Sequence, residues 1–102
     1  MFVVDDSSLK ISMNEGDFGV ILGINFTDVN ETDVVFKIYN KEMLLEKTFE
    51  NVTDNKVELK LSKEDTSKLT VGTYNYDVYQ YKEGILKNTL LKGKTFVVKE
   101  GA

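Results

Sequence analysis

The chain has 102 residues, of which 41% are hydrophobic and 29% charged, a balance typical of one folded domain with its own core. It contains no Cys and no His, which excludes disulfides, thiol or imidazole catalysis and the usual zinc sites. The net charge is -4 and every basic residue is Lys, so the bidentate contacts that Arg makes with phosphate or guanine are missing. We therefore expect neither a nucleic acid nor a membrane as a partner.

The N-terminus shows no secretory signal, because the apolar residues 2–4 are followed at once by two aspartates. Uninterrupted apolar runs are only a few residues long, far too short to span a membrane. If Met1 is the natural start, we expect a protein that is made in a cytoplasm and leaves the cell only by lysis. The lack of Cys is compatible with both oxidising and reducing compartments.

Apolar and polar residues alternate along most of the chain, which is the pattern of half-buried β-strands. We expect a short arm or edge strand over residues 1–8, one domain over residues 9–99 and a tail over residues 100–102. The alternation predicts the first five strands of the domain at residues 9–13, 18–26, 34–39, 43–49 and 57–61. The second of these has an apolar residue at every other position from Phe18 to Phe26 and is predicted to be a central strand.

The second half of the domain begins with a helix signal, Ser62 followed three residues later by Asp65. This pair predicts a capped helix of one or two turns that ends near Leu69. Two more strands are expected to form a hairpin, with Gly84 left-handed in its turn and a bulge near Gly93. With about seven strands and one short helix between the strands equivalent to E and F, the pattern predicts an all-β fold, an immunoglobulin-like antiparallel β-sandwich.

The stretch over residues 69–81 organises this prediction, because a glycine turn starts a strand with a bulky residue at every second position. In immunoglobulin-like sandwiches, a tyrosine near the start of strand F lies two residues before the core cysteine, and its hydroxyl bonds back to the backbone just upstream. Tyr74 stands at the place of that tyrosine and Tyr76 at the place of the cysteine. We therefore predict a structural corner made by Leu69, Gly72 and Tyr74. The alternative is an ordinary aromatic-rich strand after a turn.

The acidic residues give no clear metal site. Oxygen ligands alternate over residues 28–33 as in an EF-hand loop, but Asp33 stands where Gly is needed and Tyr39 where Glu is needed. A solvated loop is therefore predicted there. The acids at residues 5–6 and 15–17 could join in a looser calcium site, and we expect no metal or cofactor.

No pair of carboxylates is placed for glycosidase chemistry, and we expect Asp77 to pair with a lysine on a neighbouring strand. The most prominent candidate for an interaction surface consists of Tyr39, Tyr79 and Tyr81, which are all predicted to lie on faces opposite the core. Exposed tyrosines are preferred anchors of glycan and protein contacts. The alternative is that both sheet faces are covered or that the rings pack across strands.

Three segments in order carry a family resemblance: Gly-Asp-Phe-Gly at residues 16–19, Leu-Thr-Val-Gly-Thr-Tyr-Asn-Tyr-Asp-Val at residues 69–78, and, after Gly84, Thr-Leu with Gly-Lys-Thr-Phe-Val-Val within residues 89–98. Over about residues 9–98 the chain resembles the Ig-like domain at the N-terminus of phage baseplate upper proteins and in related head-fibre or decoration proteins of phages infecting Gram-positive bacteria. The chain departs from that pattern by stopping at residue 102, with no coiled-coil, fibre or receptor-binding segment. This difference fits either a stand-alone auxiliary protein or a shortened chain.

The resemblance implies a virion building block and not an enzyme. It implies other virion proteins as partners, a homo-oligomer within the particle and location in the virion, with no residues to transfer beyond the framework positions. A glycan-binding module on a host surface, using the three tyrosines, is the alternative. An enzyme is the least favoured reading because His and Cys are lacking.

Overall fold

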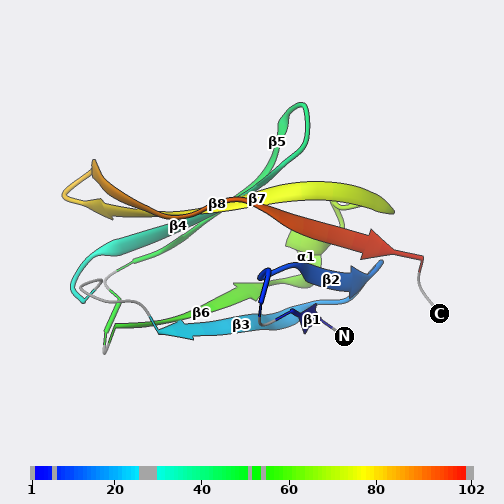
Figure 1. The fold of residues 1–102 in the computed structure, drawn as a ribbon, viewed down its shortest axis with the longest axis horizontal. Helices are drawn as coiled ribbons and strands as arrows, with labels where there is room; N and C mark the ends of the chain where they lie inside the picture. The colour runs from blue at the N-terminus through cyan, green and yellow to red at the C-terminus, as the bar shows by residue number, and fades with distance from the viewer. Residues whose placement is uncertain (1, 6, 26–29, 51, 54, 101–102) are drawn as a thin grey trace.

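The computed structural model describes residues 2–5, 7–25, 30–50, 52–53 and 55–100, with the side chains at 20–25 and 59 left aside. Within these residues the chain forms eight strands and one short helix (Figure 1). They are β1 Val3–Val4, β2 Ile11–Asn14, β3 Gly19–Asn25, β4 Asp33–Tyr39, β5 Met43–Phe49, β6 Lys56–Leu61, α1 Lys63–Thr66, β7 Gly72–Lys82 and β8 Ile85–Lys99.

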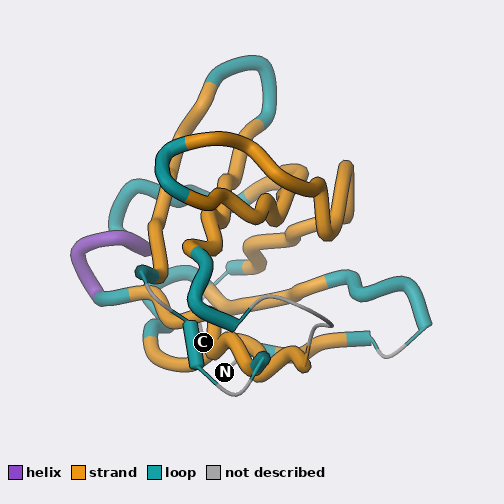
Figure 2. The backbone as a smooth tube through the Cα atoms, turned by 90° about the vertical axis from the view of Figure 1, so that its left-hand side faces the viewer, coloured by secondary structure: helices purple, strands orange, loops and turns teal. Residues whose placement is uncertain are grey.

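The strands make one sheet in the order β1-β2-β8-β7-β4-β5 and a second sheet of β3 and β6. β2 runs parallel to β8, and all the other neighbours run antiparallel. The β3–β6 pair lies beneath β4, β7 and β8 in Figure 1, and the view turned by 90° shows the two layers again (Figure 2). The predicted all-β sandwich-like fold is therefore confirmed, except that the β2–β8 pair is parallel where an antiparallel sandwich was predicted. The seven strands predicted from residue 9 onward correspond to β2 to β8, and β1 lies within residues 1–8, where an arm or an edge strand was expected.

The core lies between the layers and is centred on three aromatic rings. Tyr76 packs against Phe36 with ring centroids 5.4 Å apart and against Phe96 at 6.4 Å. The inward residues of β4, Val34, Phe36 and Ile38, are fully buried, as their alternation predicts. Burying a side chain of this kind contributes about 1.5–3 kcal/mol, so this aromatic centre is a large part of what holds the layers together.

The prediction for the strand at residues 18–26 is wrong on two points. It was expected to be a central strand, but β3 pairs with β6 in a sheet of two strands and therefore lies at an edge. Its first residue is also misplaced. Phe18 was expected to face the core, but it is 60% exposed. β3 begins only at Gly19, whose φ of 122° lies in a region that favours glycine, so the strand alternation does not extend back to Phe18. Phe26 lies outside the described residues.

The predicted helix cap is confirmed, although the helix is only one turn long. The Oγ of Ser62 accepts a hydrogen bond from the backbone N–H of Asp65 at 3.1 Å, and the Asp65 carboxylate accepts one from the backbone N–H of Ser62 at 2.9 Å. Lys47 on β5 makes an ion pair with Asp65 at 2.8 Å, which ties the helix to the six-stranded sheet. Leu69 follows the helix and is buried.

The hydroxyls of two buried tyrosines on β7 bond to backbone carbonyls, one of them nearby in the sequence and the other far away. Tyr74 donates a hydrogen bond to the carbonyl of Thr70 at 2.6 Å, which is the bond that the predicted corner requires. Tyr76 donates one to the carbonyl of Leu9 at 2.5 Å, across 67 positions of sequence. Leu9 has a φ of 59°, unusual for a residue other than glycine, and this bond helps to hold it there.

The hairpin between β7 and β8 has the turn that the sequence predicts. Glu83 and Gly84 have φ values of 52° and 79°, and two consecutive positive φ angles are the signature of a type I′ turn. The turn therefore matches the right-handed twist of its strands. The predicted bulge near Gly93 is also present, because the register between β7 and β8 shifts there.

Candidate functional site around Asp77

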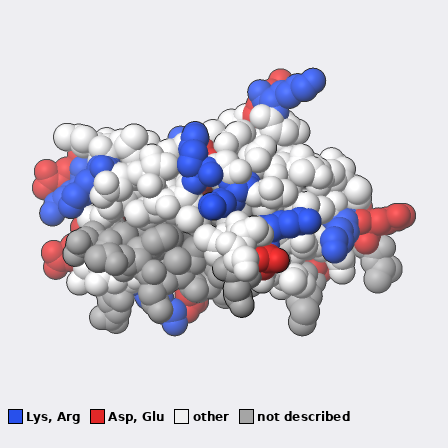
Figure 3. Space-filling view, viewed as in Figure 1, with Lys and Arg blue, Asp and Glu red and all other residues white. Residues whose placement is uncertain are grey.

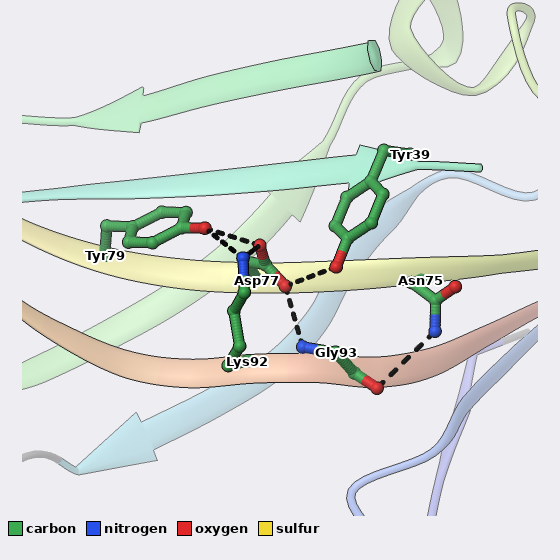
Figure 4. A network of polar contacts seen from close by, with 6 residues as sticks. All are labelled: Tyr39, Asn75, Asp77, Tyr79, Lys92 and Gly93. Carbon is green, nitrogen blue, oxygen red and sulfur yellow. Dashed lines mark hydrogen bonds and ion pairs between the residues drawn. The ribbon is translucent and has the colours of Figure 1, made fainter. Parts of the chain in front are cut away.

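A cluster of polar side chains lies on the outer face of the six-stranded sheet, opposite the core (Figure 4). Strand alternation places Asp77 and Tyr79 on this face of β7, since Tyr76 and Val78 point into the core. Tyr39 comes from the end of β4, and Lys92 and Gly93 come from β8. We call these five residues the Asp77 cluster.

Asp77 is the centre of the cluster and is only 2% exposed. One carboxylate oxygen, Oδ1, accepts hydrogen bonds from the Tyr39 hydroxyl at 2.9 Å and from the Gly93 backbone N–H at 2.7 Å. The other, Oδ2, accepts from the Tyr79 hydroxyl at 2.5 Å and from the Lys92 ammonium at 2.9 Å. These four donors offset the cost of burying a charged carboxylate, which is large when the charge has no partners.

The bulge in β8 brings two of these donors to Asp77. Tyr76 lies opposite Lys94, whereas Val78 lies opposite Leu91, so β8 has one extra residue between these two pairs. Gly93 has a φ of 64° in this stretch, and its N–H is turned toward Asp77. The conformation suits glycine, which explains why the sequence has glycine at the bulge.

The pKa values follow from this geometry. Burial by itself would raise the pKa of Asp77, but the hydrogen bonds from Gly93, Tyr79, Lys92 and Tyr39 outweigh it and lower the pKa to about 2. Hydrogen bonding to Tyr79 and Asp77 raises the pKa of Lys92. Burial, followed by the contact with Asp77, raises the pKa of Tyr39. At neutral pH, therefore, the carboxylate and ammonium are both charged and neither is poised to transfer a proton.

The Lys92 ammonium also lies near both aromatic rings of the cluster. Its nitrogen is 5.6 Å from the Tyr79 ring centroid, 6.0 Å from the Tyr39 ring centroid and 3.0 Å from the Tyr79 hydroxyl. A second cation, the Lys37 ammonium, lies 5.2 Å from the Tyr79 ring centroid. Cations at these distances are attracted by the ring faces.

The three tyrosines predicted as one interaction surface do not act together. Tyr39 and Tyr79 are half-buried and direct their hydroxyls to Asp77, so packing across strands describes them better than free exposure. Tyr81 is also half-buried and lies farther along β7, opposite Asp33 on β4 and Leu86 on β8.

The sequence predicted one contact of the cluster and missed the others. The pairing of Asp77 with a lysine on a neighbouring strand is confirmed by Lys92. The approach of Tyr79 could have been found, because residues two apart on a strand share a face. Tyr39 lies 38 positions away from Asp77, and no local pattern marks that contact.

The acids that were considered for calcium serve local turns where they are described. The Asp5 carboxylate accepts hydrogen bonds from the backbone N–H groups of Ser7 and Ser8 at 2.8 and 3.0 Å, and that of Asp17 accepts one from Asn14 at 2.9 Å. Part of the loop at residues 28–33 lies outside the described residues. Where the chain is described, no three His, Cys, Asp or Glu side chains come together as metal ligands, and no helix is long and apolar enough to cross a membrane.

Comparisons with known proteins add nothing to this site. No protein-family model, curated protein or solved structure matches the chain. Any function has to be inferred from the residues themselves.

Proposed function

We propose that the chain is an immunoglobulin-like assembly module of a phage virion, a non-enzymatic protein that binds other virion proteins and forms homo-oligomers within the particle. The virion assignment rests on the resemblance of the segments at residues 16–19, 69–78 and 89–98. The immunoglobulin-like assignment is supported by the sandwich-like layers and by the Tyr74 hydroxyl, which bonds to the backbone four residues upstream.

The observation that carries the proposal is the free edge of β8. β2 pairs with β8 only at residues 96–99, so residues 85–95 face no other strand within the described part of the chain on the side away from β7. The tip of this hairpin also exposes two apolar side chains, Ile85 at 71% and Leu86 at 49%. An exposed strand edge with apolar side chains is a template for adding a strand from another protein.

Two features of the β8 edge limit its unspecific pairing with other strands. Lys87 and Lys92 lie along it, and the register with β7 shifts at three places. Lysines and bulges are the usual means by which sheet edges resist aggregation. We therefore expect the edge to take one matched partner strand in preference to arbitrary ones.

The charge distribution supports a protein partner over a nucleic acid. The face of the molecule in Figure 3 carries lysines and acidic side chains interspersed, without a continuous basic field. Binding to nucleic acid depends on a concentration of positive charge that releases counterions. The net charge of -4 agrees with this view.

The proposal is tested on particles. Virions purified from a host culture that produces this chain should contain it in stoichiometric amount, as measured by quantitative mass spectrometry. Leu86→Lys, at the β8 edge, should reduce its incorporation strongly. Met43→Lys, at a position on β5 that is 52% exposed, is the matched control and should have little effect. Absence of the chain from the particles would refute the proposal, and equal effects of the two variants would refute the choice of edge.

The glycan-binding alternative has less support. The hydroxyls of Tyr39 and Tyr79 are bound to Asp77, and lysine ammonium groups lie near their rings. Stacking of a sugar on either ring would have to compete with these contacts. Binding to cell-wall sugars that is lost in Tyr81→Ala would favour this alternative.

A further inference from the structure

The surroundings of the Lys92 ammonium are those of a ligand in a binding site. The nitrogen contacts a buried carboxylate and a phenol oxygen, at 2.9 and 3.0 Å, and has two aromatic rings within 6.0 Å. Aromatic rings combined with an anionic group are the means by which proteins recognise ammonium ligands. We call the surface formed by Tyr39, Asp77 and Tyr79 the ammonium recess. We propose that the ammonium recess is a binding site for a primary ammonium group, which Lys92 fills as an internal ligand and which an external amine can occupy in its place.

The recess does not depend on Lys92 for its shape. Three of the four donors to Asp77 are Tyr39, Tyr79 and the Gly93 backbone, and they come from β4, β7 and β8. They hold the carboxylate in position from three adjacent strands of one sheet. Removal of the ammonium therefore leaves a preformed acceptor, and preformed sites lose little affinity to rearrangement.

The occupant, in contrast, is attached loosely. The Lys92 side chain is 65% exposed, whereas the Asp77 side chain is only 3% exposed. The ammonium thus reaches the recess from the solvent side, on a stem that contributes little to packing. An amine from outside can approach along the same direction once this exposed stem moves away.

The contacts favour a primary ammonium over other cations. Such a group has several N–H donors on one atom, and two of them fit the Asp77 carboxylate and the Tyr79 hydroxyl. A quaternary ammonium has no N–H, so it is attracted by the carboxylate charge and the rings but makes no hydrogen bond. The Lys37 ammonium, which lies over the Tyr79 ring, repels any cation there, so the hydrogen bonds are needed to secure the ligand.

Two sources share this chemistry, a free alkylammonium and the lysine of a partner protein. Lys92 is tethered beside the recess and competes at a high effective concentration. A small amine in solution lacks this high effective concentration, whereas a lysine on a docked partner protein has it. Although Lys92 lies along the β8 edge, the inference is argued from the contacts of its ammonium and does not rest on the virion assignment.

The test is rescue of a lysine deletion by amines. Lys92→Ala vacates the recess and should lower the melting temperature. Methylammonium chloride should then raise the melting temperature of Lys92→Ala in a saturable way, because a ligand that binds only the folded state stabilises it. Sodium chloride and tetramethylammonium chloride at equal concentration are the salt controls. Lys92→Met is the matched variant, since its uncharged stem still covers the recess, and it should respond less.

The outcomes are distinct. A methylammonium effect on Lys92→Ala no larger than that of the two control salts would overturn the inference. Either order of affinity supports the site. Tighter binding of Nα-acetyl-lysine amide than of methylammonium would indicate a partner's lysine as the ligand. Tighter binding of methylammonium would indicate small amines. If Lys92→Ala does not fold, Lys92→Met, which removes the competing ammonium, is titrated with methylammonium and the Gly93 amide is followed by NMR. A saturable shift of that signal is expected, and its absence would overturn the inference.

Discussion

β7 carries tyrosines on both of its faces, and the two faces use them differently. On the inner face, Tyr74 and Tyr76 donate hydrogen bonds to backbone carbonyls. On the outer face, Tyr79, joined by Tyr39 from β4, donates to the carboxylate of Asp77. The inner hydrogen bonds join neutral groups, so a fall in pH does not break them. Burial also raises the pKa of Tyr76 to about 12. The outer network depends on one charge, which makes it sensitive to pH and open to exchange of its cation.

The comparison predicts the largest loss for a change at the centre of the inner face. Tyr76→Ala removes the ring between Phe36 and Phe96 and the bond to Leu9. We expect the free energy of unfolding to fall by about 4 kcal/mol, as is usual for a buried aromatic residue replaced by Ala. Urea denaturation measures this. Tyr76→Phe keeps the ring and should cost only about 1 kcal/mol, so equal losses for both would show that the hydroxyl and not the ring matters most.

The outer face should show a smaller loss when its charge is removed. Asp77→Ala leaves the hydroxyls of Tyr39 and Tyr79 and the N–H of Gly93 without their acceptor. We expect a loss of about 3 kcal/mol in the free energy of unfolding, because part-buried donors become unsatisfied. The outer network would be dispensable if the variant unfolded at the same urea concentration as the wild type. Asp77→Asn, which retains an oxygen acceptor, serves as the comparison.

The pH dependence separates the two faces without a mutation. The pKa of Asp77 is about 2 in the folded chain against an ordinary value of 3.8, so its contribution is complete above pH 3.8 and is lost as the pH falls toward 2. The difference corresponds to about 2 kcal/mol. Urea denaturation of the wild type and of Asp77→Asn between pH 5 and about 2 should show the wild type losing more of its stability. Parallel curves would mean that Asp77 does not carry this dependence.

The smallest expected effect concerns the corner. Tyr74→Phe removes the hydrogen bond to Thr70 and keeps the buried ring. We expect a loss of about 1 kcal/mol, the usual net contribution of one hydrogen bond. Because no charge is involved, the loss should be the same at pH 7 and at pH 4. A loss that varied with pH would contradict the distinction between the two faces.

The sequence predicted those parts of the fold that depend on neighbouring residues. The strand alternation of β4, the Ser62 cap and the left-handed Gly84 all follow from local rules, and each is present. Phe18 was misplaced because an alternating pattern does not reveal where pairing begins, which here is set by the backbone at Gly19. A period of two marks a face, but it does not mark the end of a strand.

The candidate site was predictable only in part, for the same physical reason. Asp77 and its lysine partner follow from the face that alternation assigns and from the cost of an unpaired charge. The roles of Tyr39 and of the Gly93 N–H depend on which strands are neighbours and on a register shift at a bulge. These are properties of pairing between distant segments, and they cannot be obtained from one segment alone.

The parallel pairing of β2 with β8 has a consequence for the order in which the molecule forms. Ile11 and Met13 complete their sheet only against residues 96–99, and Phe96 and Val98 belong to the same core. Contacts between such distant segments close large loops and slow folding. On the ribosome, until Phe96 has left the exit tunnel, β2 can pair only with the two-residue strand β1 and not with β8. Until then the early strands must be kept from associating with other molecules, so chaperone demand should end abruptly with the emergence of this last stretch.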